Sequence, residues 1–290
     1  MKRTLVSGLM AALTLAVTPV FGNTAAPSIR RDAYTFVIVP GAWGGGWDWK
    51  TVDRLLSKDG HTVYRITLTG LGERVHLASP AITLTTHISD VVNVILYEDL
   101  HDIALVGHSY AGMVLTGVMD RVPDRIRCVI FLDAALPQDG ESCYDVYGAR
   151  VRAYKVEDGF IIPSWLDRTR PPPFYVPQPV KTWSDRVSYT NPAAKELPAA
   201  YVLFAPKGQA PETTEGFKLL QRAKDRGWPT YVMESDHMAH QSHPIELTSL
   251  LERLAQDKRK PPPQVPLPTL ASGTPVAGAP GAPRFHATSP

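Results

Sequence analysis

The middle of the chain carries a strand-like run, a turn of small residues and a helix-like run in direct succession. Apolar residues are continuous over 103–106, as in a buried strand, and recur with helical spacing over 113–121. The turn between them reads GHSYAG at 107–112 and places Ser109 on the bend, with glycines at both ends that permit strained backbone and close packing. The stretch predicts a nucleophile elbow, with Ala111 where the usual pattern has glycine. An ordinary strand-to-helix turn with a solvated serine is the alternative.

Strand-like and helix-like runs alternate along the body of the chain on both sides of this turn. Such alternation predicts an α/β fold with a mainly parallel sheet flanked by helices. It also predicts that functional groups gather at the carboxyl ends of the strands. The expected strands are Ala33–Val39, Thr62–Leu68, Ile103–Val106, Cys128–Leu132, Ala200–Ala205 and Thr230–Met233, and the expected helices include His87–Leu96, capped by Thr86, Met113–Arg121 and Pro244–Leu254.

Both ends of the sequence differ in composition from its body. Residues 1–22 begin with Lys2 and Arg3, continue with a mostly apolar run and end in small residues, which is the order of a secretory signal peptide. An uncleaved membrane anchor is the alternative. Residues 261–290 are rich in Pro, Ala, Gly, Ser and Thr, which predicts a disordered tail. We therefore expect a secreted or periplasmic protein with no stable membrane association.

Charge is balanced in the part of the chain that would remain after cleavage. Lys2 and Arg3 belong to the 30 basic residues, and the other basic residues equal the 28 acidic ones in number. A near-neutral chain without a basic patch argues against a nucleic-acid partner.

The alternation of strands and helices stops at residues 141–197. This segment is rich in Tyr, Trp, Pro and Arg, and an aromatic insertion between sheet strands suggests a lid over an apolar pocket. Structural packing alone is the other explanation of these aromatic residues. On this interpretation the flanking segments 33–140 and 198–258 form one discontinuous α/β core.

Cysteines and histidines in the sequence raise two further possibilities, a disulfide and a metal site. Export would permit a disulfide between Cys128 and Cys143, but both also fit as buried thiols, and neither has the spacing of a redox or metal motif. His237, His240 and His243 are three residues apart, yet a metal site would need their rings to converge. We expect no metal and no other cofactor.

The loop at 41–49, GAWGGGWDW, follows the first expected strand and precedes a helix. Glycine-rich loops in this position can cradle a phosphate, but neither GxGxxG nor GxxxxGK[ST] is present. Backbone amides freed of side-chain bulk can also point at a developing oxyanion. The loop is therefore a candidate oxyanion hole, and a nucleotide ligand is not expected.

Three segments together resemble one family. FVIVPGAWGGGWDW at 36–49, GHSYAGMV at 107–114 and DHMAH at 236–240 are similar to the plant methylesterase and hydroxynitrile lyase family and its bacterial esterase relatives, within the α/β-hydrolase superfamily. A serine after a middle strand and a histidine after the last strand follow the Ser, acid, His order of that superfamily. The resemblance covers about residues 34–257 and implies the α/β-hydrolase fold with an inserted cap.

The resemblance also implies roles for individual residues. Ser109 would be the nucleophile, and His237 would take its proton and later protonate the leaving alcohol. The backbone amides of Ala42 and Tyr110 would hold the negative oxygen of the tetrahedral intermediate. Pro40 replaces the histidine that the family usually has, which affects the expected shape of this loop more than its amides.

Substrate contacts are the least defined part of this expectation. We expect Trp43, His108 and Met238 beside the substrate. Trp43 fits the hydrophobic core equally well, and His108 also fits a role in packing beside the nucleophile.

The acid of the expected triad departs from the plant relatives. Their aspartate follows the strand equivalent to Ala200–Ala205, where this chain reads PKGQAP. Asp133 ends the strand after the elbow helix, at a position that resembles the alternative acid of pancreatic-type lipases. We expect Asp133 to orient His237, with Glu212 and Asp139 as the alternatives, or with Asp133 as a structural loop anchor.

These features favour an exported serine hydrolase that cleaves small carboxylic esters, such as aryl or alkyl esters or lactones. A hydroxynitrile lyase is a weaker alternative, because the lyases have threonine at the position of Gly41 and lysine at that of Met238. A binding protein that has kept the fold but lost turnover is the alternative from another class.

Overall fold

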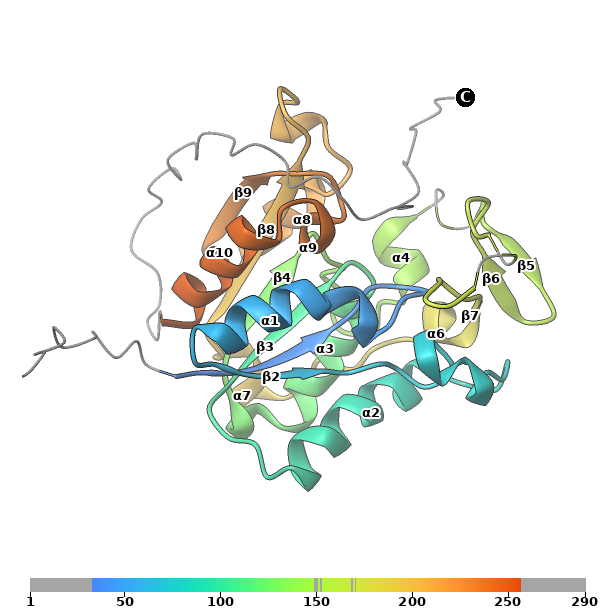
Figure 1. Cartoon of the computed structure of the whole chain (residues 1–290), viewed down its shortest axis with the longest axis horizontal. Helices are drawn as coiled ribbons and strands as arrows, with labels where there is room; N and C mark the ends of the chain where they lie inside the picture. The colour runs from blue at the N-terminus through green and yellow to red at the C-terminus, as the bar shows by residue number, and fades with distance from the viewer. Residues whose placement is uncertain (1–32, 149–150, 152, 168, 170, 257–290) are drawn as a thin grey trace, which may run out of the picture. The chain divides into compact units, whose positions relative to one another are not determined.

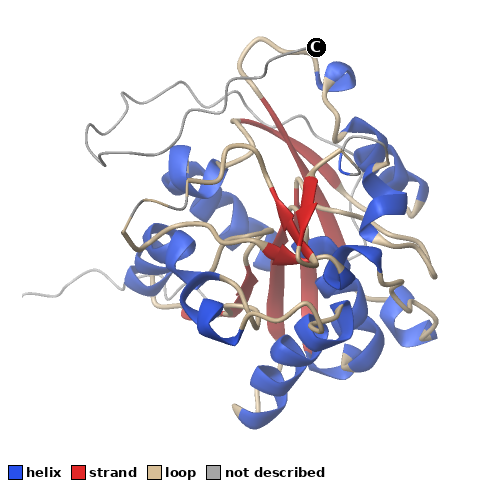
Figure 2. Ribbon diagram, turned by 90° about the vertical axis from the view of Figure 1, so that its right-hand side faces the viewer, coloured by secondary structure: helices blue, strands red, loops and turns tan. Residues whose placement is uncertain are grey.

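In the computed structural model, the alternating runs of the sequence form a six-stranded parallel sheet with helices on both faces (Figures 1 and 2). The strand order is β2-β1-β3-β4-β8-β9, and every neighbouring pair is parallel. The carboxyl ends of all six strands therefore lie at one edge of the sheet. The strands are β1 Thr35–Val39, β2 Thr62–Arg65, β3 Ile103–His108, β4 Ile126–Leu132, β8 Ala199–Ala205 and β9 Thr230–Glu234.

Two hydrophobic clusters lie on the two faces of this sheet. Alternate residues of a strand point to opposite faces, so Val37 belongs to one cluster and Ile38 to the other. The first cluster contains apolar residues of α2, α3 and α8, and the second contains those of α1 and α10. Because both faces are covered, β3 and β8 are buried along their whole length, as in other parallel sheets. The helices are α1 Lys50–Lys58, α2 Leu84–Tyr97, α3 Ala111–Arg121, α8 Phe217–Asp225, α9 Ala239–Ser242 and α10 Pro244–Gln256, with short 3₁₀ helices at Gly46–Trp49, Gly72–Leu77, Pro123–Arg125 and Pro211–Thr213.

The predicted N-cap of α2 was wrong by three residues. Thr83, and not Thr86, precedes the helix, and its side-chain oxygen accepts a hydrogen bond from the Thr86 amide at 3.1 Å. The Thr86 hydroxyl in turn accepts from the Thr83 amide at 3.3 Å, which completes a capping box with threonine in place of the usual acid. Both threonines can cap a helix, and the helix begins three residues earlier than expected, at the buried Leu84.

The chain between β4 and β8 has its own small elements. A three-stranded antiparallel sheet consists of β5 Lys155–Glu157, β6 Phe160–Ile162 and β7 Gln178–Pro179. The short helices that the structure describes in this segment are α4 Cys143–Tyr147, α6 Lys181–Ser184 and α7 Pro192–Lys195. Figure 1 shows β5, β6 and β7 beside one another and apart from the central sheet.

The two cysteines lie on opposite sides of the sheet. Cys128 belongs to the cluster under α1 and α10, and Cys143 to the cluster under α2 and α3. Both are buried, and no disulfide joins them.

The structure describes residues 33–148, 151, 153–167, 169 and 171–256. All of these residues belong to one unit of the chain. The expected signal peptide at 1–22 and the expected tail at 261–290 are outside the described residues. Within the described ranges, no helix has the length and apolar character needed to cross a membrane.

Candidate active site

Ser109 stands on a strained bend directly after β3. Its backbone φ is 55°, in the left-handed region that residues other than glycine seldom adopt. Its amide donates to Leu132 O at 3.1 Å, and its carbonyl accepts from the Ala135 amide at 2.9 Å, so the neighbouring strand end holds the bend in place. A Cβ on Gly112 would lie 1.7 Å from Ala135 O, which explains the glycine at this position. The predicted strand, sharp turn and helix are thus present.

His237 connects Ser109 to Asp133. Its Nε2 lies 3.0 Å from Ser109 Oγ, and its Nδ1 lies 2.6 Å from Asp133 Oδ2. An ionised carboxylate can only accept, so Nδ1 carries the proton and Nε2 is left to accept from the serine hydroxyl. The His237 side chain is 49% exposed and that of Asp133 is 15% exposed. The arrangement can move a proton from the serine to the histidine at a site open to a ligand.

Asp133 reaches this position from the end of β4. Its φ of 42° is also left-handed, and its amide donates to Val202 O of β8 at 2.7 Å. Neither of the two alternatives from the sequence forms a hydrogen bond or ion pair with His237 in the described part of the chain. Asp139 accepts a hydrogen bond from the Tyr189 amide at 2.8 Å, and Glu212 is exposed in a short 3₁₀ helix.

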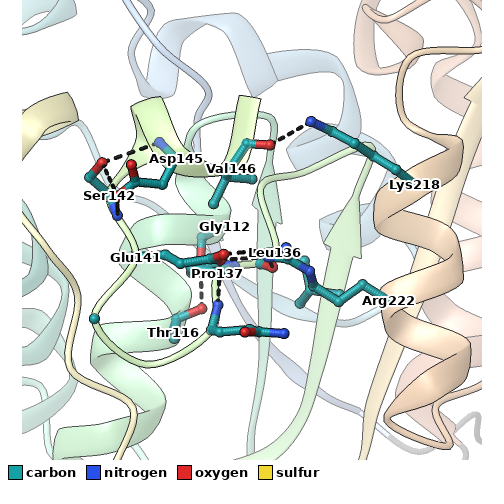
Figure 3. Close-up of polar contacts among 12 residues, drawn as sticks. Gly112, Thr116, Leu136, Pro137, Glu141, Ser142, Asp145, Val146, Lys218 and Arg222 are labelled. Atoms are coloured by element: carbon teal, nitrogen blue, oxygen red, sulfur yellow. Dashed lines mark hydrogen bonds and ion pairs between the residues drawn. The ribbon is translucent and has the colours of Figure 1, made fainter. Parts of the chain in front are cut away.

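Helix α8 anchors the chain that follows Asp133 (Figure 3). Arg222 donates to Leu136 O at 2.7 Å and to the Glu141 carboxylate at 2.5 Å. Lys218 donates to Val146 O at 2.6 Å, one turn along the same helix. These bonds hold the first residues of the inserted segment next to the end of β4.

The glycine-rich loop after β1 packs against the serine. A Cβ on Gly41 would lie 2.9 Å from His108 Nδ1 and 3.2 Å from Ser109 Cβ, so the threonine of the lyases has no room here. Among the described residues, none accepts a hydrogen bond from the backbone amides of Ala42 and Tyr110. Two uncommitted amides beside the serine are what an oxyanion hole requires.

The inserted segment holds this loop by its backbone. The Trp43 amide donates to Gln178 Oε1 at 2.9 Å, and the Trp43 carbonyl accepts from the Val176 amide at 2.9 Å. Trp43 has a φ of 63°, a strained value that these two bonds help to maintain. The bonds to Gln178 and Val176 could not be found from the sequence, because the partners are more than 130 residues apart.

The three residues expected beside the substrate have different surroundings. The Trp43 ring packs against the rings of Tyr154, Trp165 and Trp183, with centroids 5.4 Å from each. Met238 directly follows His237 and is half-buried. His108 is buried, and its Nε2 donates to His237 O at 2.7 Å. His108, which directly precedes Ser109, therefore contacts the backbone of His237, as expected if it packs beside the nucleophile.

Burial lowers the pKa of His108 well below its usual value, and the neighbouring His237 and His240 lower it further. His108 is therefore neutral, and its Nε2 proton stays on the bond to the His237 carbonyl.

A buried hydrogen bond between His87 and Tyr110 was not predicted from the sequence. His87 Nε2 donates to Thr69 O at 3.0 Å, which leaves Nδ1 to accept from the Tyr110 hydroxyl at 3.0 Å. Burial lowers the pKa of His87 to about 4, so the ring is neutral in the native state. The available signal was the helical spacing of His87 with Val91 and Ile95, which places the imidazole on the buried face of α2.

His240 and His243 have separate partners. His240 Nε2 lies 3.0 Å from Asp48 Oδ2, and His243 Nδ1 lies 3.1 Å from Ser235 Oγ. No cluster of three or more metal-binding side chains occurs in the described ranges. The spacing of three residues did not reveal the contact between His240 and Asp48, which lie 192 positions apart.

Comparison with known proteins agrees with this architecture. The sequence profile of the alpha/beta hydrolase family matches residues 36–250. A carbendazim-hydrolysing esterase of Nocardioides sp. is 50% identical over 107 residues, which cover 37% of this chain and 44% of the esterase. Salicylic acid-binding protein 2 of Nicotiana tabacum is 28% identical over 182 residues, which cover 61% of this chain and 59% of that protein. The matches thus span about half the length of these two relatives.

Solved structures show the same fold. An extracellular alpha/beta-hydrolase from a Paenibacillus species superimposes with a TM-score of 0.65 at 24% identity, over 77% of this chain and 100% of that one. A methylesterase from Arabidopsis superimposes with a TM-score of 0.60, also at 24% identity, over 76% of this chain and 98% of that one.

Proposed function

We propose that this chain, which belongs to the alpha/beta hydrolase family, is a serine esterase that cleaves small carboxylic esters through an acyl-enzyme on Ser109. The observation that carries the proposal is the hydrogen-bonded series from Ser109 Oγ through His237 to the Asp133 carboxylate. The esterase names of several relatives support ester hydrolysis as the reaction.

Acylation begins when Ser109 Oγ attacks the ester carbonyl carbon and its proton passes to His237 Nε2. The carbonyl oxygen becomes negative and accepts from the amides of Ala42 and Tyr110, each worth about 3 kcal/mol in comparable enzymes. Asp133 stays ionised and stabilises the imidazolium. His237 then protonates the leaving alkoxide, the C–O bond breaks, and the alcohol departs.

Deacylation repeats these steps with water as the nucleophile. His237 takes one proton from the water, hydroxide adds to the acyl carbon, and the oxyanion again lies between the two amides. The bond to Ser109 Oγ breaks, and Oγ recovers its proton from His237. The products are a carboxylic acid and the free enzyme, with no other reactant consumed.

The surroundings of the serine support a small, partly aromatic substrate. Trp43 follows the proposed oxyanion hole directly and lies in a cluster of four aromatic rings with Tyr154, Trp165 and Trp183. Planar acyl or alcohol groups suit such surroundings, because aromatic rings bury large areas and stack at these distances. We propose that 141–197 is a cap over the substrate site, and that residues 1–22 direct export.

Mass spectrometry after labelling tests the proposed nucleophile. The full-length chain is expressed, treated with a serine-directed phosphonate and analysed as intact protein and as peptides. One adduct on Ser109 is expected, and none in Ser109→Ala or His237→Ala. His101→Ala, which changes an exposed histidine, serves as the matched control and keeps the adduct. The intact mass also reports whether residues 1–22 have been removed.

Turnover is then measured with p-nitrophenyl acetate, aromatic methyl esters and carbendazim. Hydrolysis of any of these that is lost in Ser109→Ala supports the esterase. A folded protein that takes no label, or that binds these compounds without turnover, contradicts it in favour of the binding protein. Release of cyanide from mandelonitrile would favour the lyase instead.

A further inference from the structure

A second buried carboxylate lies close to the proposed active site. Asp48 is on the 3₁₀ helix Gly46–Trp49, a few residues after the proposed oxyanion loop, and its side chain is only 6% exposed. Its Oδ2 accepts from His240 Nε2 at 3.0 Å and from the Tyr175 hydroxyl at 2.9 Å. Its Oδ1 accepts from the Gln241 side-chain amide. No Lys or Arg of the described chain forms an ion pair with it, so these three donors carry its stabilisation.

Two of these donors belong to the same short segment as His237. His240 and Gln241 lie on α9, three and four residues after the histidine. The His240 ring stacks on Trp49, with centroids 4.4 Å apart and planes 5° from parallel. Trp49 therefore contacts the face of the ring, while Asp48 binds the nitrogen at its edge.

The other anchor of this segment is His108, whose Nε2 donates to the His237 carbonyl at 2.7 Å. His108 directly precedes Ser109, and Asp48 follows the Gly41–Trp43 loop. The segment from His237 to Gln241 is therefore attached at one end beside the nucleophile and at the other beside the oxyanion loop.

From these contacts we infer that Asp48 is a positioning residue, which sets the distance between His237 Nε2 and Ser109 Oγ by holding α9. The inference rests on the proposed role of His237 as the general base. Asp48 touches no reacting atom, so its loss should affect the rate and leave substrate binding nearly unchanged. Catalytic geometry is sensitive to small displacements, and a shift of about 1 Å can cost about 100-fold in rate.

Asp48→Asn is the informative substitution, because the amide has the same size but presents an NH₂ group to one of the donors. We expect kcat for p-nitrophenyl acetate to fall about 10- to 100-fold, with KM within about 2-fold of wild type. His240→Gln should lower kcat by a similar factor. The double variant should be no slower than the slower single variant, since both substitutions break one connection.

Two variants separate positioning from general damage to the fold. Asp53→Asn removes a carboxylate on the adjoining helix that pairs with Arg65 at 2.8 Å, and it should leave kcat unchanged. Tyr175→Phe removes one donor to Asp48 and the hydroxyl that accepts from Gln241 at 3.0 Å, but it leaves the bond between His240 and Asp48, so it should lower kcat less than Asp48→Asn. Thermal unfolding of each variant identifies any loss of folded protein.

A measurement without turnover completes the test. The His237 proton bonded to Asp133 should give a low-field proton resonance, which we expect to broaden or disappear in Asp48→Asn and to persist in Asp53→Asn. An Asp48→Asn protein with wild-type kcat and an intact resonance would overturn the inference, as would the same loss of kcat in Asp53→Asn. If wild type takes no phosphonate label and shows no turnover, the proposed function fails, and the resonance still decides whether Asp48 positions His237.

Discussion

At the scale of single residues, the site combines strained backbone with bonds from neighbouring strands. Ser109 and Asp133 both have left-handed φ values, which cost of the order of 1–3 kcal/mol each in residues with a Cβ. The Ser109 amide bonds to Leu132 O, and the Asp133 amide bonds to Val202 O. The sheet therefore supports both strained residues at adjacent strand ends and presents their side chains to His237.

Asp133→Asn should lower kcat about 10⁴-fold, as in other enzymes with a Ser-His-Asp triad. The amide NH₂ can donate to His237 Nδ1, which would move the imidazole proton to Nε2 and remove the base that faces Ser109. Steady-state kinetics with an activated ester measure the change.

Asp139→Asn and Glu212→Gln are the matched controls for this prediction. Asp139 anchors the Tyr189 amide, and its loss should lower thermal stability without a comparable loss of rate. A normal rate in Asp133→Asn, together with a loss in either control, would transfer the role to that residue.

At the scale of elements, the start of α2 is set by reciprocal side-chain bonds. Thr83 and Thr86 each accept a hydrogen bond from the other's amide. The helix carries His87, which contacts the Tyr110 hydroxyl, so its first turn also supports the residue after the nucleophile.

Thr83→Ala should reduce the free energy of unfolding by about 1 kcal/mol, the usual cost of losing an N-cap side chain. Thr85→Ala, at an exposed position of the same turn, should change it by less than about 0.5 kcal/mol. Urea denaturation of the two variants measures the difference. Equal values for both would show that the capping box contributes nothing to stability.

At the scale of the whole molecule, buried neutral histidines make folding sensitive to acid. The pKa of His87 falls from 6.5 to about 4 in the native state, and that of His108 also falls well below its usual value. Below pH 6.5 the unfolded chain binds protons that the native state does not, so stability falls as the pH decreases. For His87 this loss continues until the pH reaches about 4.

His87→Gln should weaken this acid sensitivity, because glutamine can keep both hydrogen bonds without titrating. Between pH 6 and pH 4.5, its stability should fall less steeply than that of wild type, by up to about 1.4 kcal/mol per pH unit. Chemical denaturation at several pH values measures the slopes. His76→Gln, an exposed control, should keep the wild-type slope. Parallel curves for wild type and His87→Gln would contradict the neutral state of His87.

Local sequence patterns predicted most of the fold. The parallel sheet, its flanking helices and the strained turn at Ser109 follow from residue periodicity and from small residues at the bend, which act over a few positions. The start of α2 was predicted wrongly, because Thr83 and Thr86 both fit an N-cap and only the completed helix distinguishes them.

The sequence by itself determined the strand order along the chain, the elbow and the presence of a histidine after the last strand. Only the tertiary structure decided which carboxylate meets His237, that Gln178 holds the loop at Trp43, and that Asp48 binds His240. The physical reason is the separation of these partners, which lie more than 100 positions apart. Periodicity and turn chemistry act within one element, whereas contacts between strand ends depend on how the whole sheet is assembled.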